Sequence, residues 1–477
     1  MKKIFYLIFL LSVIMGCTMS RSPKEKAEVS PSIYPDYVNV TIPSNISPIN
    51  FGIEDADYIK VKISSINSNN EKGSIELTGK NYINIPLKKW KKLLSENIEK
   101  EISISVAVWN DKYPEGIEYK PFNVYVSKDT IDSFIAYRLV DPGYAWGEMG
   151  IYQRNLSTFD EIEIVSNRDV RERCFNCHSF CNNDADVFMF YERGKNGGTI
   201  IKDKETLSKV DLNKVKSGKA TTYPSWHPSG NYIAFSCNAT RQSFYKEGSP
   251  IEVYDLESDL VVYDRKGNQL LSIPELSSKE NLETFPTWSP DGKFLYYCGA
   301  EIKEMPYEKD SLKYSICRIS FDQEKGILDN HIDTLFVNET FSKSVSFPKI
   351  SYDNKYLLYT ESGCGTFPIW HKEAELKMID LENNSVVDTD ILNSNETESY
   401  HCWSKNSKWI VFSSRRDDGR YTRLYFAYLD DNGKWHKPFL LPQKNPYHNI
   451  ERLKSYNIPE LVNKKITINK AELNNLL

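Results

Sequence analysis

The chain has 477 residues, 40% of them hydrophobic and 26% charged, a balance typical of a folded, soluble protein with two or three domains. Its formal net charge of −5 gives no basic excess, which argues against nucleic acid as a partner. The 30 Tyr and 22 Phe against 7 Met favour short strands and turns, so we expect an all-β fold.

The N-terminal stretch "MKKIFYLIFLLSVIMGC" combines two lysines, an apolar run from Ile4 to Met15, and Gly16 directly before Cys17. A charged start, a short apolar segment and a small residue before the cleavage point are the parts of a signal peptide. The stretch resembles a bacterial lipoprotein signal peptide over residues 1–17, which implies that Cys17 carries lipid. We therefore expect a protein anchored in the cell envelope, in the outer membrane and facing the periplasm. A plain signal peptide or a retained transmembrane helix is the alternative.

Residues 18–33 are polar and are expected to form a tether. Between residues 34 and 140, segments such as "YIKVKISS", "ISISVAVWN" and "FNVYVS" alternate apolar and polar side chains. This period of two predicts a small β-sandwich-like domain. The segment "PLKKWKKLLSENIEK" interrupts the strands and places Leu87, Trp90, Leu94 and Ile98 on one face of a predicted helix.

The rest of the chain repeats itself. "YPSWHPSGNYIAFS" begins at Tyr223, "FPTWSPDGKFLYYC" at Phe285, "FPKISYDNKYLLYT" at Phe347 and "YHCWSKNSKWIVFS" at Tyr400. An aromatic residue, Pro or His, a large apolar residue, a turn and a strand recur in each copy, as in the blades of a β-propeller. We expect six blades over residues 141–461, with "FDEIEIVS" and "KPFLLPQ" joining early and late sequence in the sixth, and a tail at 462–477.

These repeats resemble the TolB-type propeller repeat. Together with "CFNCHSF", "ETFPTWSPDGK", "SVSFP" and "SSRRDDG", they make the chain similar to a group of TolB-like lipoproteins of Gram-negative bacteria. The resemblance runs from about Asp141 to Leu461 and implies a propeller whose function is poorly defined. The charges from Arg415 to Asp418 fit a hairpin turn better than a ligand site.

The motif Cys174-x-x-Cys177-His178 is the attachment pattern of c-type haem, in which two thiols bind the vinyl groups and the histidine binds iron. Ser179 and Phe180 directly follow the motif. When they are aligned with Ser225 and Trp226 of "YPSW", the motif falls at the start of the first blade. Haem c held by Cys174, Cys177 and His178 is therefore expected. Two alternatives stay open: a disulfide between the two cysteines, or a zinc site that also includes Cys181.

A second haem ligand could come from several residues. His401 takes the place of the proline in "YPSW" and "FPTW", which is also the place of His178, so it could reach the same iron from a neighbouring blade. Its alternative role is to cap a strand or to hydrogen-bond a backbone carbonyl. The other candidates are Met149, Met189, His227 and His371.

Three functions follow from these patterns. The first is electron transfer or haem-dependent sensing by a lipid-anchored propeller, with a redox or envelope protein as partner. The second is a propeller scaffold that binds envelope proteins or glycans, with the cysteine pair as a structural disulfide. The third is a haem enzyme such as a peroxidase or reductase. No hydrolase or transferase motif stands out.

Overall fold

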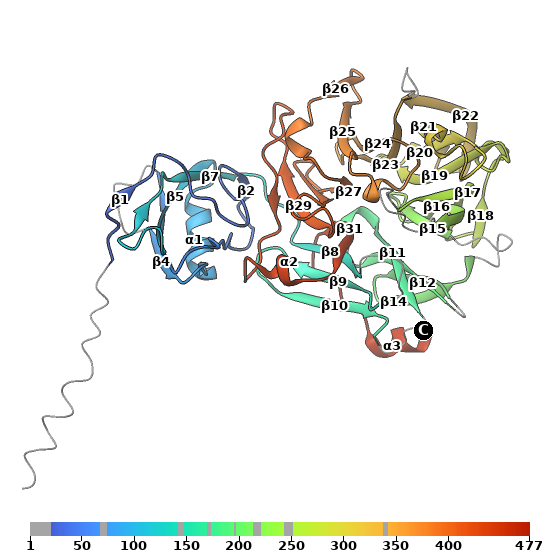
Figure 1. Ribbon diagram of the computed structural model, residues 1–477. Coiled ribbons are helices and arrows are strands. Elements are labelled where there is room, and N and C mark those ends of the chain that lie inside the picture. The colour runs from blue at the N-terminus through green and yellow to red at the C-terminus, as the bar shows by residue number, and fades with distance from the viewer. Residues whose placement is uncertain are drawn as a thin grey trace, which may run out of the picture.

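The computed structural model describes residues 21–66, 74–141, 147–168, 173–194, 197–212, 221–242, 251–336 and 342–477 (Figure 1). The predicted signal peptide and Cys17 lie outside these residues. Among the residues that are described, no helix is long and apolar enough to cross a membrane. The chain forms a small N-terminal domain beside a larger propeller.

The strands described between residues 21 and 127 form one sheet in the order β1-β6-β5-β3-β4, while β7 pairs with β5 and with β2. Their bounds are β1 (Glu25–Lys26), β2 (Thr41–Pro43), β3 (Tyr58–Ser65), β4 (Ile75–Gly79), β5 (Lys100–Trp109), β6 (Ile117–Glu118) and β7 (Phe122–Ser127). Because all pair into one network, a sandwich of two stacked sheets is not confirmed. Part of the expected tether belongs to this domain, since β1 pairs with β6.

Helix α1 (Leu87–Glu96) forms where the amphipathic segment predicts it and buries Trp90, Leu93 and Leu94. The indole nitrogen of Trp90 donates a hydrogen bond to the carbonyl of Ile46 at 3.1 Å. Ile98 lies beyond the end of the helix and is exposed, so its predicted place on the buried face is wrong.

The described residues after 133 form six four-stranded antiparallel sheets, the blades of a six-bladed β-propeller. Five blades are continuous in sequence. The first holds β11 (Cys174–Phe180), β12 (Val187–Arg193), β13 (Gly198–Asp203) and β14 (Thr206–Val210). The second holds β15 (Thr221–Trp226), β16 (Tyr232–Gln242), β17 (Val253–Asp264) and β18 (Gln269–Leu271). The third holds β19 (Asn281–Trp288), β20 (Phe294–Glu301), β21 (Ser315–Asp322) and β22 (Ile327–Phe336).

The fourth blade holds β23 (Ser344–Ile350), β24 (Tyr356–Ser362), β25 (Glu375–Asp380) and β26 (Ser385–Val387). The fifth holds β27 (Glu398–Trp403), β28 (Trp409–Ser414), β29 (Arg423–Tyr428) and β30 (Phe439–Leu440). Two short helices, α2 (His448–Glu451) and α3 (Lys470–Leu476), flank the last strand of the chain.

The sixth or closing blade joins early and late sequence in the order β10-β9-β8-β31. Its strands are β8 (Phe134–Val140), β9 (Gly150–Asn155), β10 (Glu161–Ser166) and β31 (Ser455–Val462). The early strand β10 lies in the expected segment "FDEIEIVS". The late strand is β31 and not the expected "KPFLLPQ", which supplies β30 of the fifth blade. The blade also begins before residue 141, since β8 is its second strand.

The innermost strand of every blade carries the same β-bulge. In each, one residue has a positive φ between 46° and 54°, and the strand register shifts there: Cys177, Tyr223, Phe285, Phe347, Tyr400 and Ile458. Positive φ is uncommon for residues other than glycine, so its recurrence marks a built feature of the repeat. The residue that follows is proline in four blades, and His178 and His401 in the other two.

Because antiparallel strands alternate in direction, the two ends of the propeller axis differ. The turns between first and second strands, such as 227–231 and 289–293, lie on one face, which we call the turn face. The loops between second and third strands, such as 302–314 and 363–374, lie on the other, the loop face.

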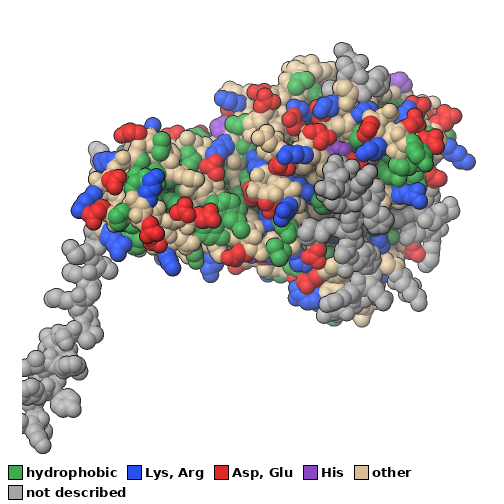
Figure 2. Space-filling view, in the orientation of Figure 1, with side chains coloured by type: hydrophobic (Ala, Val, Ile, Leu, Met, Phe, Trp, Pro, Cys, Tyr) green, Lys and Arg blue, Asp and Glu red, His purple; other side chains and the backbone are tan. Residues whose placement is uncertain are grey.

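The N-terminal domain packs against the fifth blade through a shared apolar core that includes Trp409 and Phe426. The Trp409 indole donates to the carbonyl of Asp129 at 3.0 Å, and the Tyr37 hydroxyl donates to the carbonyl of Leu440 at 3.3 Å. Figure 2 shows basic and acidic side chains interspersed over the visible face of both parts.

Candidate functional site

The inner strands of all six blades enclose a cavity of about 170 Å³ on the propeller axis, the axial pocket. Its base is the ring of six bulge residues, of which Cys177 and Ile458 are the two that are not aromatic. Ring centroids lie 4.4 Å apart for Tyr223 and Phe285, 4.1 Å for Phe285 and Phe347, and 4.9 Å for Phe347 and Tyr400. Aromatic contacts at these separations stabilise a rigid, apolar base.

Trp226, Trp288 and Trp403 form part of the pocket wall and are buried, as their equivalent repeat positions predict. The indole nitrogen of Trp226 donates to the carbonyl of Ser179 at 3.0 Å, and that of Trp403 to the carbonyl of Lys349 at 3.2 Å. The indoles of Trp226 and Trp403 therefore tie their own blades to the preceding ones, whereas the indole nitrogen of Trp288 has no hydrogen-bond partner among the described residues.

The polar residues that line the pocket include Glu460, Lys349 and His178. Burial raises the pKa of Glu460 to about 7, and the charge of Lys349 opposes this shift. One Glu460 oxygen accepts the backbone N–H of Phe180 at 3.1 Å, and the other lies 3.8 Å from Nε2 of His178. The result is an apolar cavity with a carboxyl group and an ammonium group in its wall.

His178 is buried between the closing blade and the first blade. Burial, with the charge of Arg138, lowers the pKa of His178 to about 4, while a hydrogen bond to the backbone of Ile458 opposes the shift. The imidazole is therefore neutral at neutral pH. Its Nε2 is buried and has no hydrogen-bond partner among the described residues. Burial also raises the pKa of the neighbouring Cys177 thiol.

His401 occupies the equivalent position between the fourth and fifth blades. Its Nε2 hydrogen-bonds the carbonyl of Leu358 at 3.0 Å, and burial lowers the pKa of His401 to about 3. Its alternative role, a hydrogen bond to a backbone carbonyl, is thus what the structure contains. The expectation that His178 and His401 come from neighbouring blades is wrong, because β31 inserts the closing blade between the fifth and the first.

Cys174 has different surroundings from Cys177 and is not among the residues that line the axial pocket. Its sulfur lies 3.5 Å from Nη2 of Arg138, which also lies 3.2 Å from the sulfur of Met149. The whole motif lies in strand β11 rather than in a turn. The two thiols therefore do not face a common space in the described part of the chain.

The remaining candidate ligands lie elsewhere. Met189 is fully buried in the core between the first two blades. His227 has its Nε2 3.0 Å from the carbonyl of Gly292 and its Nδ1 2.7 Å from the hydroxyl of Ser229. His371 lies on the loop face, where Nε2 is 3.2 Å from Glu252.

A covalent haem does not fit this arrangement. The unpartnered Nε2 of His178 and the free thiols would suit it, but only one of the two thiols opens into the cavity. Engineered cavities of about 150 Å³ hold one benzene ring, so the 170 Å³ of the axial pocket takes a single ring and a porphyrin would extend beyond it. The disulfide is not formed either, and Cys174, Cys177, Cys181 and His178 do not gather around a common point within the described residues.

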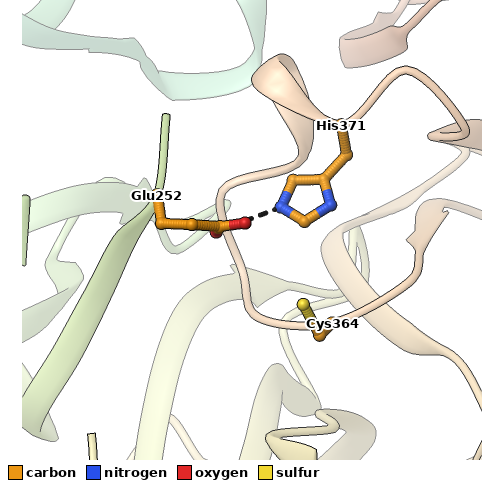
Figure 3. Close-up of side chains that lie close together, drawn as sticks. All are labelled: Glu252, Cys364 and His371. Carbon is orange, nitrogen blue, oxygen red and sulfur yellow. Dashed lines mark hydrogen bonds and ion pairs between the residues drawn. The ribbon is translucent and has the colours of Figure 1, made fainter. Parts of the chain in front are cut away.

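Two features escaped the sequence analysis. The sixth copy of the repeat is "NIPELV" at Asn457, where Ile458, Pro459 and Glu460 match the "YPSW" pattern; its proline was the available signal. The second is a cluster of Glu252, Cys364 and His371 on the loop face (Figure 3). Glu252 lies 119 residues before His371, so no local motif joins it to Cys364 and His371.

No known protein family matches the sequence, and no curated protein matches it. Solved structures that match include an oligogalacturonate lyase from Vibrio parahaemolyticus, with 11% identity over 60% of this chain and 85% of the lyase, and a TM-score of 0.34. A GH74 enzyme from Niastella koreensis matches with 11% identity over 63% of this chain and 44% of its own, and a TM-score of 0.39.

A Mycobacterium tuberculosis puromycin-hydrolyzing peptidase matches with 8% identity over 72% of this chain and 52% of its own, and a TM-score of 0.37. The chain thus spans about half of the GH74 enzyme and of the peptidase. At such low identity and TM-score, these matches say nothing about function.

Proposed function

We propose that this chain is a ligand-binding propeller of the bacterial cell envelope, and that the axial pocket is its binding site. The observation that carries the proposal is the pocket itself: an aromatic-lined cavity on the axis with several convergent polar groups, one of which has a strongly shifted pKa. Ligand sites in proteins have this composition. The N-terminal signal supports the location, because lipid on Cys17 would anchor the protein at the membrane.

The chemistry of the pocket favours a small zwitterion with an aromatic body. The cavity holds one ring, the aromatic base supplies stacking surface, Glu460 can accept from an amino group, and Lys349 can donate to a carboxylate. A protein or glycan partner, as in the scaffold function, would enter the pocket with only one side chain or one ring.

The test uses three probes that share a benzene ring and differ in charge: L-phenylalanine, benzylamine and benzoate. Trp226, Trp288 and Trp403 line the pocket, so binding should change the tryptophan fluorescence of the full chain with saturation. We expect L-phenylalanine to bind most tightly, because it alone offers both charges.

Replacement of Thr287, which lines the pocket, by Phe fills the cavity and should abolish the response. Ile327→Phe is the matched control, since Ile327 lies in the same blade on its outermost strand and is 55% exposed. The proposal fails if no probe produces a saturable change, or if Thr287→Phe responds like the control.

Electron transfer or sensing through haem c is the second candidate function. The specific observation in its favour is the buried, unpartnered Nε2 of His178 beside the free thiol of Cys177. This function would require Cys174 to turn toward Cys177 and the pocket to widen.

A further inference from the structure

A cluster of three potential metal ligands lies on the loop face. The carboxylate of Glu252, the sulfur of Cys364 and the imidazole of His371 all lie within 4.8 Å of one another. Figure 3 shows the His371 ring facing Glu252, with the Cys364 sulfur pointing toward both. Cys364 and His371 are buried, at 8% and 5% relative exposure, and the Glu252 side chain is 11% exposed.

The ligands come from two blades. Glu252 directly precedes β17 of the second blade, while Cys364 and His371 lie in the loop between β24 and β25 of the fourth. Lys309 and Asp310 from the third blade lie beside them, 3.9 Å from Glu252 and 4.0 Å from Cys364. The cluster therefore links three consecutive blades at the end of the axis opposite the turn face.

Hydrogen bonds to residues outside the loop hold the backbone of the loop that carries Cys364 and His371. The amide of Gly365 donates to the carbonyl of Leu312 at 2.9 Å, and the hydroxyl of Thr397 donates to the carbonyl of His371 at 2.7 Å. A fixed backbone keeps the two side chains in place before any ion arrives, which lowers the cost of binding.

We propose that Glu252, Cys364 and His371 bind a zinc ion. Zinc accepts carboxylate oxygen, thiolate sulfur and imidazole nitrogen in one tetrahedral site. At metal–ligand distances of about 2.0–2.3 Å, the ligand atoms of a tetrahedral site lie about 3.3–3.8 Å apart. Nε2 of His371 and the carboxylate oxygen of Glu252 are 3.2 Å apart, which is close to this separation. Three protein ligands leave the fourth position open to water or to a ligand.

Glu373 supports the site through a hydrogen bond to His371 and does not itself bind the ion. Its carboxylate accepts from Nδ1 of His371 at 3.0 Å and from the amide of Gly363 at 3.0 Å. A carboxylate on the far nitrogen of a metal-binding histidine fixes the ring orientation and leaves Nε2 free for the metal. Glu373 is thus a positioning residue.

The test is a zinc and cobalt titration of the full chain. We expect one zinc per chain by elemental analysis after gel filtration, and a cobalt absorption band from thiolate ligation. Cys364→Ser and His371→Ala should lose the band and the bound zinc. Glu373→Gln, which leaves all three ligands in place, should weaken zinc binding about 10- to 100-fold.

Cys317→Ser is the control, because Cys317 is also a free thiol with 8% exposure but lies outside the cluster. Circular dichroism checks that each variant folds; if His371→Ala does not, Glu373→Gln decides. The proposal is overturned if the wild-type chain binds no zinc, if Glu373→Gln and Cys364→Ser bind like the wild type, or if zinc is lost in Cys174→Ser instead.

Discussion

Replacing His178 by proline tests whether His178 is only a repeat position of the blade or also a haem ligand. Four blades already have proline after their positive-φ residue, so His178→Pro should be accepted by the backbone of the first blade. If His178 serves only the blade, the variant should fold with nearly unchanged stability.

The free-energy terms nearly cancel. Proline at a compatible position stabilises by about 0.4–1 kcal/mol through the unfolded chain. Removal of the buried, unpartnered Nε2 of His178 relieves a cost of about 1–3 kcal/mol. The lost hydrogen bond to the backbone of Ile458 costs about 1 kcal/mol, and the space that the smaller ring leaves unfilled costs about 1–2 kcal/mol. The midpoints of these ranges nearly cancel, so the net change should stay within about 2 kcal/mol, a melting-temperature shift of about 8 °C or less.

His401→Pro is the matched control. His401 has the same repeat position and also buries an unpartnered nitrogen, Nδ1, but its Nε2 bonds the carbonyl of Leu358. Each variant loses one hydrogen bond to a backbone group and one buried, unpartnered nitrogen, so His401→Pro and His178→Pro should have the same stability within about 2 kcal/mol. Urea unfolding followed by tryptophan fluorescence measures both. A loss above about 3 kcal/mol in His178→Pro that His401→Pro does not share would refute this reasoning.

Three further outcomes are expected. Glu460→Gln should gain stability over the wild type as pH rises from about 4.5 to 7, by at most about 3 kcal/mol. Burial raises the pKa of Glu460 to about 7, so in this range the carboxyl group ionises in the unfolded chain before it does in the folded one, and this opposes folding of the wild type. An equal difference in urea midpoint at pH 4 and pH 8 would contradict this prediction. Cys17→Ser should release the protein from membranes, and continued membrane association after detergent-free fractionation would show another anchor. A chain that ends before Ser455 lacks β31 and leaves β8 as an open edge, so it should aggregate or melt earlier; a monomer of unchanged melting temperature would show that the closing strand is dispensable.

The propeller could be predicted because its repeats carry strong local signals. Each "aromatic, Pro or His, x, apolar" segment combines a bulge, a turn and a strand, and four copies agree in Tyr223, Phe285, Phe347 and Tyr400. The equivalence of His178 and His401 followed from the same alignment. The closing strand was missed because Ile458 replaces the aromatic residue and no Asp-Gly turn follows it.

The site was harder to predict because its chemistry depends on distance in space. Cys174, Cys177 and His178 match a haem pattern by spacing, but an extended strand turns residues three apart toward different surroundings. The pairing of Glu460 with His178, and the gathering of Glu252 with His371, depend on which blades meet, which local patterns do not encode.

The visible absorption and intact mass of the full chain, produced in a bacterium that matures c-type haem, most directly test whether "CFNCH" is part of the blade or a cofactor site. If Cys177 and His178 serve as base and wall of a ligand pocket, the chain should show no Soret absorption and no added haem mass. A pigment that survives denaturation and thiol treatment, with the mass of one haem added to the chain, would contradict this role and restore haem as the function of the motif.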